Sequence, residues 1–457
     1  MSILSVEAAP NPRNWPHWLL WLSTLLGIVW PIAHSVALRN SLLAMLLIGG
    51  MTLYLRQAHR QIIPRALQYP ARIYLMLSVW LLITVMLADA PLNSLSQYRG
   101  EWLMALAAML IGLLLTNLAV QNQSPSLSRN GLLNSVSLAL FVPCLIQLLH
   151  TAGFYLQHKT LPMWDVPLFG RTSLSFVHNI LYGMLLADAL ARCGGRQRLL
   201  PLPNTLLLIA FVASFICTYL LNTRNGTLCV LLITLISALI GWYQHRRQIN
   251  NTVLIGIISA LLLVMASYAK LTYDAEPRWA AFGESTRLAW DTEHHKAWLD
   301  DNIPLPTMSN GHPVDHSAYM RLAWFKEGGL AIRDYPLGVG FGRNAYGHAM
   351  KRKYGMGTGH SHSSLIDFTL SGGIPGLLLW LLFCGSLIRL GWRAYFHNHD
   401  VVGMALIMLV VGTLLRMIVD SNLRDHGLEQ FLFLAAVLAS LAANGMQQNL
   451  TKPAFSE

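Results

Sequence analysis

The feature that most constrains this chain is a series of long apolar runs that contain few charges. A helix needs about 20 predominantly apolar residues to cross the hydrocarbon core of a bilayer, and such runs recur throughout the 457 residues. Charged residues make up only 12% of the chain, whereas a soluble domain usually carries about 25%. The sequence therefore predicts an all-α polytopic membrane protein.

About twelve transmembrane helices are predicted from these runs. Arg39 and Asn40 are polar exceptions near the start of the second helix. The tenth contains Gly372, Gly373 and Pro375, which predict a break or kink. The predicted spans cover residues 17–34, 36–55, 72–88, 102–120, 131–153, 173–191, 203–221, 226–243, 252–269, 365–391, 401–420 and 429–444.

The loops between these spans differ in their content of basic residues. Basic residues gather on the cytoplasmic side of membrane proteins, so the richer set, with twelve against six, is predicted to be cytoplasmic together with both termini. In a soluble protein the net charge of +11 would suggest nucleic-acid binding. Here the same rule accounts for it, so no nucleic-acid partner is expected. The richer set is Arg56, Arg60, Arg65, Arg72, Arg129, Arg192, Arg196, Arg198, Arg246, Arg247, Arg389 and Arg393; the poorer set is Arg39, Arg99, Lys159, Arg171, Arg224 and Arg424.

Three parts of the chain follow from this arrangement. Residues 1–269 hold nine spans, residues 270–362 form a large and mostly helical periplasmic loop, and residues 363–457 hold three more spans and a short tail. The N-terminus lacks a cleavable signal pattern, so the first span is expected to remain as an uncleaved anchor.

The periplasmic insert has an apolar pattern of its own. Leu322, Trp324, Phe325 and Leu330 fit an amphipathic helix that starts near Asp315 and ends at the Asp-Tyr-Pro of 334–336. The run 336–342 that follows is too rich in glycine for a helix. A loop of this length is usually functional or disordered, and four tryptophans favour a folded lid: Trp279, Trp290, Trp298 and Trp324.

Two histidines stand where the insert enters the tenth span. His360 and His362 can meet both a lipid-linked substrate and water there, and a neutral imidazole is a ready proton acceptor. A histidine that merely marks the membrane interface is the alternative for either one. A metal site that joins them to His294, His295, His312, His316 or His348 is weakly supported, because the partners are scattered. The five cysteines show neither a disulfide framework nor a zinc-type spacing, and no metal or cofactor is expected.

Three arginines are candidates for binding an anion. Arg224 lies in a very short turn between two apolar runs, where it either snorkels or binds a charged ligand. Arg321 lies on the predicted helix of the insert and Arg171 just ahead of the sixth span; a solvated surface position is the alternative for both. The planar guanidinium donates two parallel hydrogen bonds, which suits phosphate. His178 and Asn179, within the sixth span, are assigned a structural role.

At these residues the chain resembles the O-antigen ligase and polymerase superfamily. Its pattern has His-Asn, an apolar pair, and Gly-hydrophobic-Pro-Gly that begins eleven residues after the histidine. His362 is followed at that spacing by Gly373-Ile-Pro-Gly376, although Ser363 replaces the usual asparagine. Arg321, Trp324 and the run 336–342 match the superfamily's Arg, Trp and Pro-Leu-x-Gly-x-Gly pattern, and Arg224 matches its Ser-Arg-Gly-like turn. The resemblance covers roughly residues 165–395.

The resemblance implies a metal-independent, inverting glycosyltransferase of the bacterial inner membrane, acting in lipopolysaccharide biosynthesis. The donor would be a glycan on undecaprenyl pyrophosphate and the acceptor a sugar hydroxyl of lipid A–core. By the same resemblance His362 would activate that hydroxyl, while Arg224 and Arg321 would bind the pyrophosphate. Arg171 is expected to assist them, and His360 is a secondary candidate. Surrounding membrane lipids are the other expected partners.

Other functions remain open at this point. An O-antigen polymerase and a protein O-oligosaccharyltransferase belong to the same superfamily. A transporter of lipid-linked glycans is a more distant alternative, because transporters often have repeated halves or paired broken helices, and the sequence offers one broken span without a counterpart.

Overall fold

The computed structural model describes residues 17–56, 62–121, 128–163, 166–246, 251–274, 282–357 and 359–451. Within these ranges the chain forms helices, turns and two isolated bridge pairs, and no β-strand. The predicted all-α class is confirmed for this part of the chain. Both chain ends, Arg60, Arg247 and Trp279 lie outside the described residues.

The helices fall into a membrane domain and an insert. The membrane domain contains α1 (Trp18–Val29), α2 (Val36–Leu55), η2 (Arg65–Leu67), α3 (Gln68–Val85), α4 (Pro91–Gln97), η3 (Tyr98–Leu103), α5 (Met104–Gln121), α6 (Arg129–His158), α7 (Arg171–Cys193), α8 (Asn204–Leu221), α9 (Arg224–His245), α10 (Asn251–Asp274), α14 (Ser364–Trp392), η5 (Arg393–His397), α15 (Val402–Val419) and α16 (Asp425–Thr451). The insert contains α11 (Phe282–Trp290), α12 (His316–Asp334) and α13 (Ala345–Tyr354).

Ten helices among the described residues are long and apolar enough to cross a membrane. Each coincides with a predicted span. The first predicted span corresponds to α1, whose 12 residues reach only about 18 Å. The ninth corresponds to α10, a helix of 24 residues whose side chains are described only in part. The count of twelve therefore stays a prediction, and a multi-pass helical protein is established.

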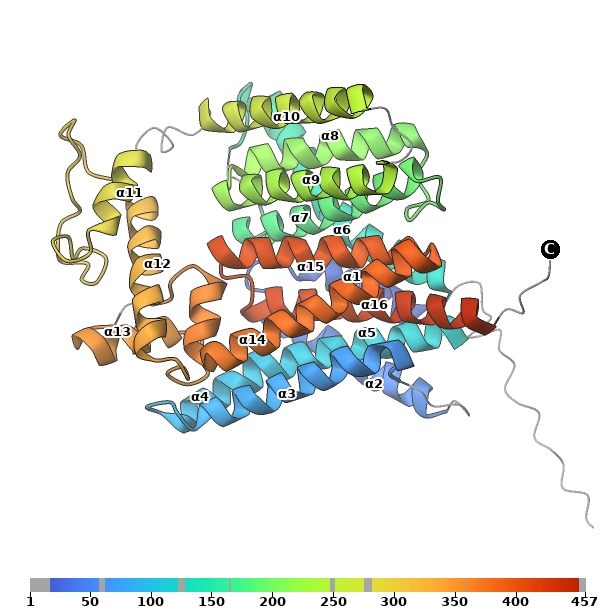
Figure 1. Ribbon diagram of the computed structural model, residues 1–457, viewed down its shortest axis with the longest axis horizontal. Coiled ribbons are helices and arrows are strands. Elements are labelled where there is room, and N and C mark those ends of the chain that lie inside the picture. Colours follow the sequence, from blue (N-terminus) through green and yellow to red (C-terminus); the bar gives the residue numbers. More distant parts are fainter. Residues whose placement is uncertain are drawn as a thin grey trace, which may run out of the picture.

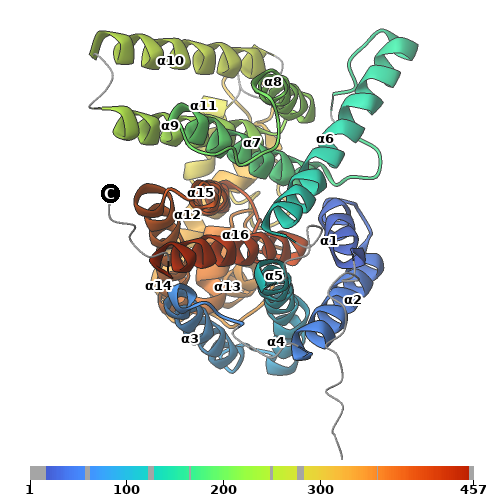
Figure 2. The ribbon, with the colours of Figure 1, turned by 90° about the vertical axis from the view of Figure 1, so that its right-hand side faces the viewer.

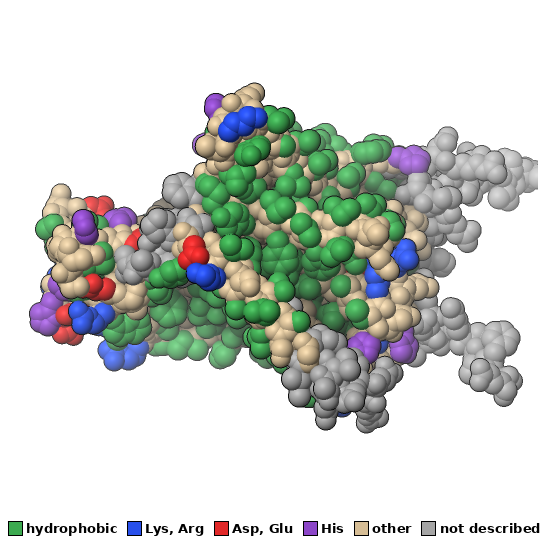
Figure 3. Space-filling model, turned by 90° about the horizontal axis from the view of Figure 1, so that it is seen from above, with side chains coloured by type: hydrophobic (Ala, Val, Ile, Leu, Met, Phe, Trp, Pro, Cys, Tyr) green, Lys and Arg blue, Asp and Glu red, His purple; other side chains and the backbone are tan. Residues whose placement is uncertain are grey.

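The membrane helices lie side by side, with the insert at one end of the bundle (Figure 1). Seen along the bundle, α16 runs through the middle and packs against α5, α14 and α15 (Figure 2). Hydrophobic side chains cover the middle of the bundle's flank, and charged side chains gather toward its ends (Figure 3). Leucines such as Leu149 on α6, Leu208 on α8 and Leu263 on α10 are exposed, as expected for side chains that hydrocarbon would solvate.

Arg39, a charged residue in the second predicted span, has a buried partner. Nε of Arg39, on α2, lies 3.1 Å from the Glu429 carboxylate on α16. The Trp30 indole N–H donates to the same carboxylate at 3.3 Å. An ionisable residue within a membrane helix requires such a partner, so Arg39 is compatible with the span and ties α2 to the centre of the bundle.

A second buried ion pair was not foreseen from the sequence. Arg416 of α15 has no exposed surface, and its Nη2 lies 2.7 Å from the carboxylate of Asp420 at the end of the same helix. The guanidinium also donates to Asn179 Oδ1 at 2.5 Å and to Ser175 Oγ at 3.1 Å, both on α7. Arg416 therefore links α15 to α7 through a buried polar network.

The insert has a core of its own and packs on the membrane domain. Trp298, Tyr319, Ala323 and Tyr346 are buried in one cluster that continues onto Ile366 and Leu370 of α14. The start of α12 is fixed by Asp315, which accepts a hydrogen bond from the Ala318 amide at 3.1 Å. The predicted helix of the insert and its bounds are thus confirmed. Residues 291–315 form turns instead of helix, so the insert is less helical than predicted.

The glycine-rich run 336–342 forms backbone hydrogen bonds with the kinked part of α14. Gly373 has φ 67° and ψ 179°, so the helical bond from the Ile374 amide to the Leu370 carbonyl is absent. The Ile374 amide instead donates to the Pro336 carbonyl at 2.8 Å, and the Leu370 carbonyl accepts from the Val339 amide at 2.7 Å. The loop therefore satisfies two of the backbone groups that the kink releases.

This contact leaves no room for a side chain at Gly373. A Cβ atom there would lie 2.5 Å from the Leu337 carbonyl carbon, and φ would be strained for any other residue. Replacing Gly373 by alanine is expected to destabilise the folded protein by at least about 2 kcal/mol, measured as a lower thermal unfolding midpoint in detergent.

Gly385 provides the matched control on the same helix. A Cβ at Gly385 meets nothing within 4 Å, so Gly385→Ala is expected to be neutral or to stabilise by up to about 1 kcal/mol. Equal midpoints for the two alanine variants would contradict the proposed role of the backbone contact.

Candidate functional site

The segment that carries His360 and His362 is a turn clamped to the ends of two membrane helices. The Ser361 amide donates to Asp367 Oδ1 at 3.0 Å, and the Ser364 amide donates to the Asp420 carbonyl at 2.9 Å. His362 itself has φ 57°, a left-handed conformation that is uncommon outside glycine. The surrounding bonds therefore hold His362 in one unusual backbone geometry.

The ring of His362 lies between two aromatic neighbours. It stacks on Trp324 of α12 with ring centroids 5.5 Å apart and an angle of 18°, and it lies 4.1 Å from the ring of His360. Burial lowers the pKa of His362, and the positive charges of Arg321 and Arg424 act in the same direction, while Asp420 opposes them. The ring is thus favoured in the neutral form, which is the form that accepts a proton.

Arg224 and Arg321 come from different helices and meet near His362. Arg224 is the first residue of α9, and its Nη2 lies 3.1 Å from the carboxylate of Asp315, the residue that caps α12. Arg321, nearly two turns further along α12, donates to Asn225 Oδ1 at 3.4 Å. Helix α12 therefore carries Arg321, and its capping residue Asp315 holds Arg224.

These residues border a first cavity of about 310 Å³. Its walls are mostly apolar, and its charged groups are the two arginines. Leu322 and Phe325, which the sequence assigns to the apolar face of α12, pack against the edge of the insert core and also line this cavity. The first cavity is lined by Arg224, Asn225, Leu228, Phe282, Ser317, Ala318, Arg321, Leu322, Phe325, Ser361, His362, Ser363, Ile418 and Val419.

A second cavity of about 340 Å³ lies on the other side of Arg321 and His362. These two residues are common to both cavities and form the wall between them. The remaining lining is polar and comes largely from the turn between α15 and α16. The second cavity is lined by Thr172, Ser173, Phe176, Arg321, His360, His362, Asp420, Ser421, Asn422, Arg424, His426 and Gly427.

Arg171 lies beside the site rather than within it. Its Nε donates to the Leu221 carbonyl at 2.8 Å, and its Nη2 donates to the Asn222 carbonyl. It therefore caps the C-terminal end of α8 and supports the turn that leads to Arg224. Arg171 lines neither of the two cavities, and its predicted contact with pyrophosphate stays a prediction.

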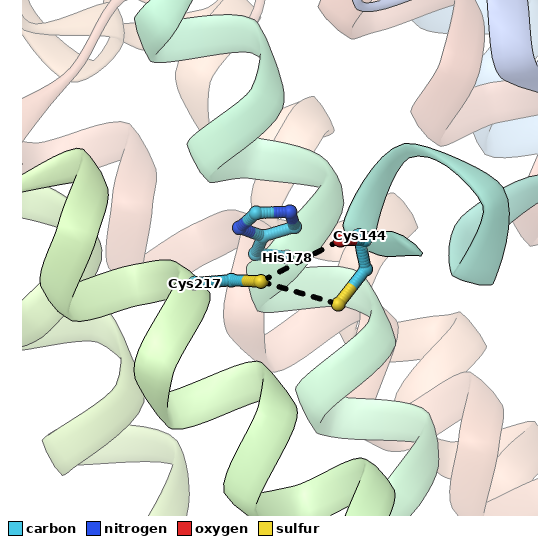
Figure 4. Close-up of side chains that lie close together, drawn as sticks. All are labelled: Cys144, His178 and Cys217. Atoms are coloured by element: carbon cyan, nitrogen blue, oxygen red, sulfur yellow. Dashed lines mark hydrogen bonds between the residues drawn. The ribbon is translucent and has the colours of Figure 1, made fainter. Parts of the chain in front are cut away.

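One group of possible metal ligands occurs among the described residues, and it lies apart from the site. Cys144 of α6, His178 of α7 and Cys217 of α8 bring their ligand atoms within 4.8 Å of one another, with the two sulfurs 3.3 Å apart (Figure 4). All three are buried in the membrane domain and line neither of the two cavities. This group could not be predicted from the sequence, because its members come from three helices without a metal-type spacing.

Several residues at the site were not predicted as functional candidates from the sequence. Arg416 and Asp420 form the buried ion pair beside the second cavity. Arg424 enters the sequence prediction only as one of the basic loop residues that set the orientation. An arginine inside the eleventh span is itself a signal, because intramembrane charges are functional candidates by default. No such signal marks Asn422 or His426.

Comparison with known protein families gives a match over part of the chain. Residues 209–381 match the family model described as O-antigen ligase, a range that lies within the resemblance found from the sequence. Arg224, Arg321 and His362 fall inside the match, whereas Arg171, the turn between α15 and α16 and the start of α16 fall outside it. No curated protein matches the chain.

Proposed function

We propose that this chain, whose residues 209–381 match the family model described as O-antigen ligase, joins a lipid-linked glycan to lipid A–core. The donor is a glycan on undecaprenyl pyrophosphate, and the reaction takes place at the periplasmic face of the bacterial inner membrane. The observation that carries the proposal is the convergence of Arg224, Arg321 and His362 on the first cavity.

In the proposed reaction His362 acts as the general base. The oxygen of an acceptor hydroxyl attacks the anomeric carbon of the donor sugar and gives its proton to His362. The bond between that carbon and the pyrophosphate oxygen breaks, and undecaprenyl pyrophosphate leaves. A single displacement of this kind inverts the configuration at the anomeric carbon. The neutral state favoured for His362 suits the base that this step requires.

Arg224 and Arg321 are proposed to hold the pyrophosphate. Negative charge grows on the leaving group as the bond breaks, and preorganised guanidinium groups stabilise such charge. Asp315 holds the guanidinium of Arg224 in one position, which limits the reorganisation that donor binding requires. The apolar side chains of the first cavity, such as Leu228 and Phe325, suit the lipid that carries the pyrophosphate.

Two related activities use the same chemistry with another acceptor. A polymerase would join the glycan to a second lipid-linked repeat unit, and a protein oligosaccharyltransferase would join it to a hydroxyl side chain. The ligase is preferred because of the large insert between α10 and α14.

Deletion of the gene in its host is expected to remove the O-antigen ladder from lipid A–core while polymer accumulates on its carrier, as seen on gels of lipopolysaccharide. Complementation with wild type restores the ladder.

His362→Ala is expected to lower transfer about 10²- to 10⁴-fold, the usual contribution of a general base. A ladder reduced to one repeat unit would identify a polymerase, and unchanged lipopolysaccharide with lost glycoproteins would identify protein glycosylation.

Arg224→Lys tests pyrophosphate binding. Lysine keeps the positive charge but loses the planar pair of donors, so the KM for the donor is expected to rise about tenfold, the equivalent of one charge-assisted hydrogen bond. Arg287→Lys is the control, because Arg287 is exposed on α11 and lines neither of the two cavities. A wild-type KM in Arg224→Lys would remove Arg224 from the donor site.

The pH dependence of kcat/KM tests the protonation state of His362. Because burial lowers the pKa of His362, activity is expected to persist below pH 6.5 and to fall as the pH drops through that lowered pKa. Trp324→Ala admits water to the ring, so its acidic limb is expected to move to higher pH. Trp290→Ala, at a side chain exposed on α11, should leave the limb unchanged; equal shifts in both variants would exclude the stacking contact as the cause.

A further inference from the structure

The second cavity contains buried polar groups that no described residue satisfies. Nε and Nη1 of Arg424, Oδ1 of Asn422 and Oγ of Ser421 are shielded from solvent and have no hydrogen-bond partner among the described residues. Asn422 is only 6% exposed. A buried polar atom without a partner costs about 1–3 kcal/mol, so a group of them around one cavity points to a ligand that supplies the missing bonds.

The charge of the second cavity favours an anionic ligand. Arg321 and Arg424 both line it, and its one described carboxylate, Asp420, is already paired with Arg416 at 2.7 Å. Ser173 at the start of α7 and His426 at the start of α16 also line it. Helix N-termini carry partial positive charge and attract anions. The site is therefore electropositive and also rich in groups that bind hydroxyls.

The turn that carries these groups is fixed before any ligand binds. The Leu423 amide donates to Ser364 Oγ at 2.8 Å, and Asn422 Nδ2 donates to the Thr413 carbonyl at 2.9 Å. Ser173 Oγ and His426 Nε2 are 2.7 Å apart. Because these bonds orient the turn 420–424 and the start of α16, the unsatisfied atoms form a preorganised surface.

The position of the second cavity assigns it to one of the two substrates. It shares His362 and Arg321 with the first cavity but lacks Arg224 and most of the apolar lining. If the lipid pyrophosphate occupies the first cavity, the group that His362 deprotonates must approach from the second. We propose that the second cavity binds the acceptor saccharide, and that Arg424 recognises a phosphate or carboxylate on it close to the reacting hydroxyl. This inference rests on the proposed function.

Arg424→Lys in the purified full-length protein tests the inference. Lysine keeps a positive charge beside His362 but cannot reproduce the donors at Nε and Nη1. The KM for lipid A–core is expected to rise about tenfold, while the KM for the undecaprenyl pyrophosphate donor stays at the wild-type value. Arg333→Lys is the matched control, because Arg333 is exposed at the end of α12 and pairs with Asp334. A raised KM for the donor instead of the acceptor would overturn the proposal.

Chemically altered acceptors identify the anionic group. If Arg424 binds phosphate, dephosphorylated lipid A–core is expected to bind wild type and Arg424→Lys equally. If it binds a carboxylate, reduction of the acceptor's carboxyl groups abolishes the difference instead. A difference that survives both treatments would show that Arg424 recognises no acceptor anion.

Binding of fluorescent lipid A–core, measured without donor, separates this inference from the proposed function. Absence of transfer by wild type would refute the ligase function, whereas equal binding by wild type and Arg424→Lys would refute only the anionic subsite. The thermal unfolding midpoint of Arg424→Lys, expected to equal that of wild type, establishes that a binding loss is not a folding loss.

Discussion

The buried guanidinium of Arg416 fixes the relative positions of the two parts of the candidate site, which are the start of α9 with Arg224 and the turn that carries His362. Toward one side it bonds Asn179, whose own amide donates to the Gly226 carbonyl at 3.2 Å, next to the turn of Arg224. Toward the other side it pairs with Asp420, whose carbonyl accepts the Ser364 amide at the end of the histidine turn. A charge buried in a membrane helix is costly unless its partners are well placed. Any displacement of α15 relative to α7 would break these bonds, so the positions of Arg224 and His362 are coupled through one residue.

The insert contributes to the same rigidity by a different means. Its glycine-rich run supplies the backbone partners that the kinked α14 lacks, and α12 then lies against α14 with Trp324 on His362. Hydrogen bonds between backbones require close approach, which explains why glycines occur on both sides of the contact. The insert is therefore joined to the membrane domain by backbone hydrogen bonds and packing contacts that begin a few residues from His362, the proposed base.

The sequence was sufficient for the features that depend on local pattern. The apolar runs predicted the ten helices that meet the membrane criteria, and Gly373 with Pro375 predicted the break in α14. Arg224, Arg321 and His362 were selected from their positions and from the resemblance, and they do line one cavity. Contacts between distant helices were out of reach. Nothing local to Arg416 indicates that Asn179 is its partner, and nothing local to Asn422 or Arg424 indicates that a cavity lies beside them.

The left-handed backbone at His362 has a consequence for how this protein can evolve. A non-glycine residue at φ 57° stores about 1–2 kcal/mol of strain, and glycine would relieve it. The residue that best fits the backbone at this position is thus one that has no imidazole. Selection for thermal stability alone would favour removal of the ring, so under the proposed role of His362 as the base its presence is a trade-off in which stability is given up for chemistry.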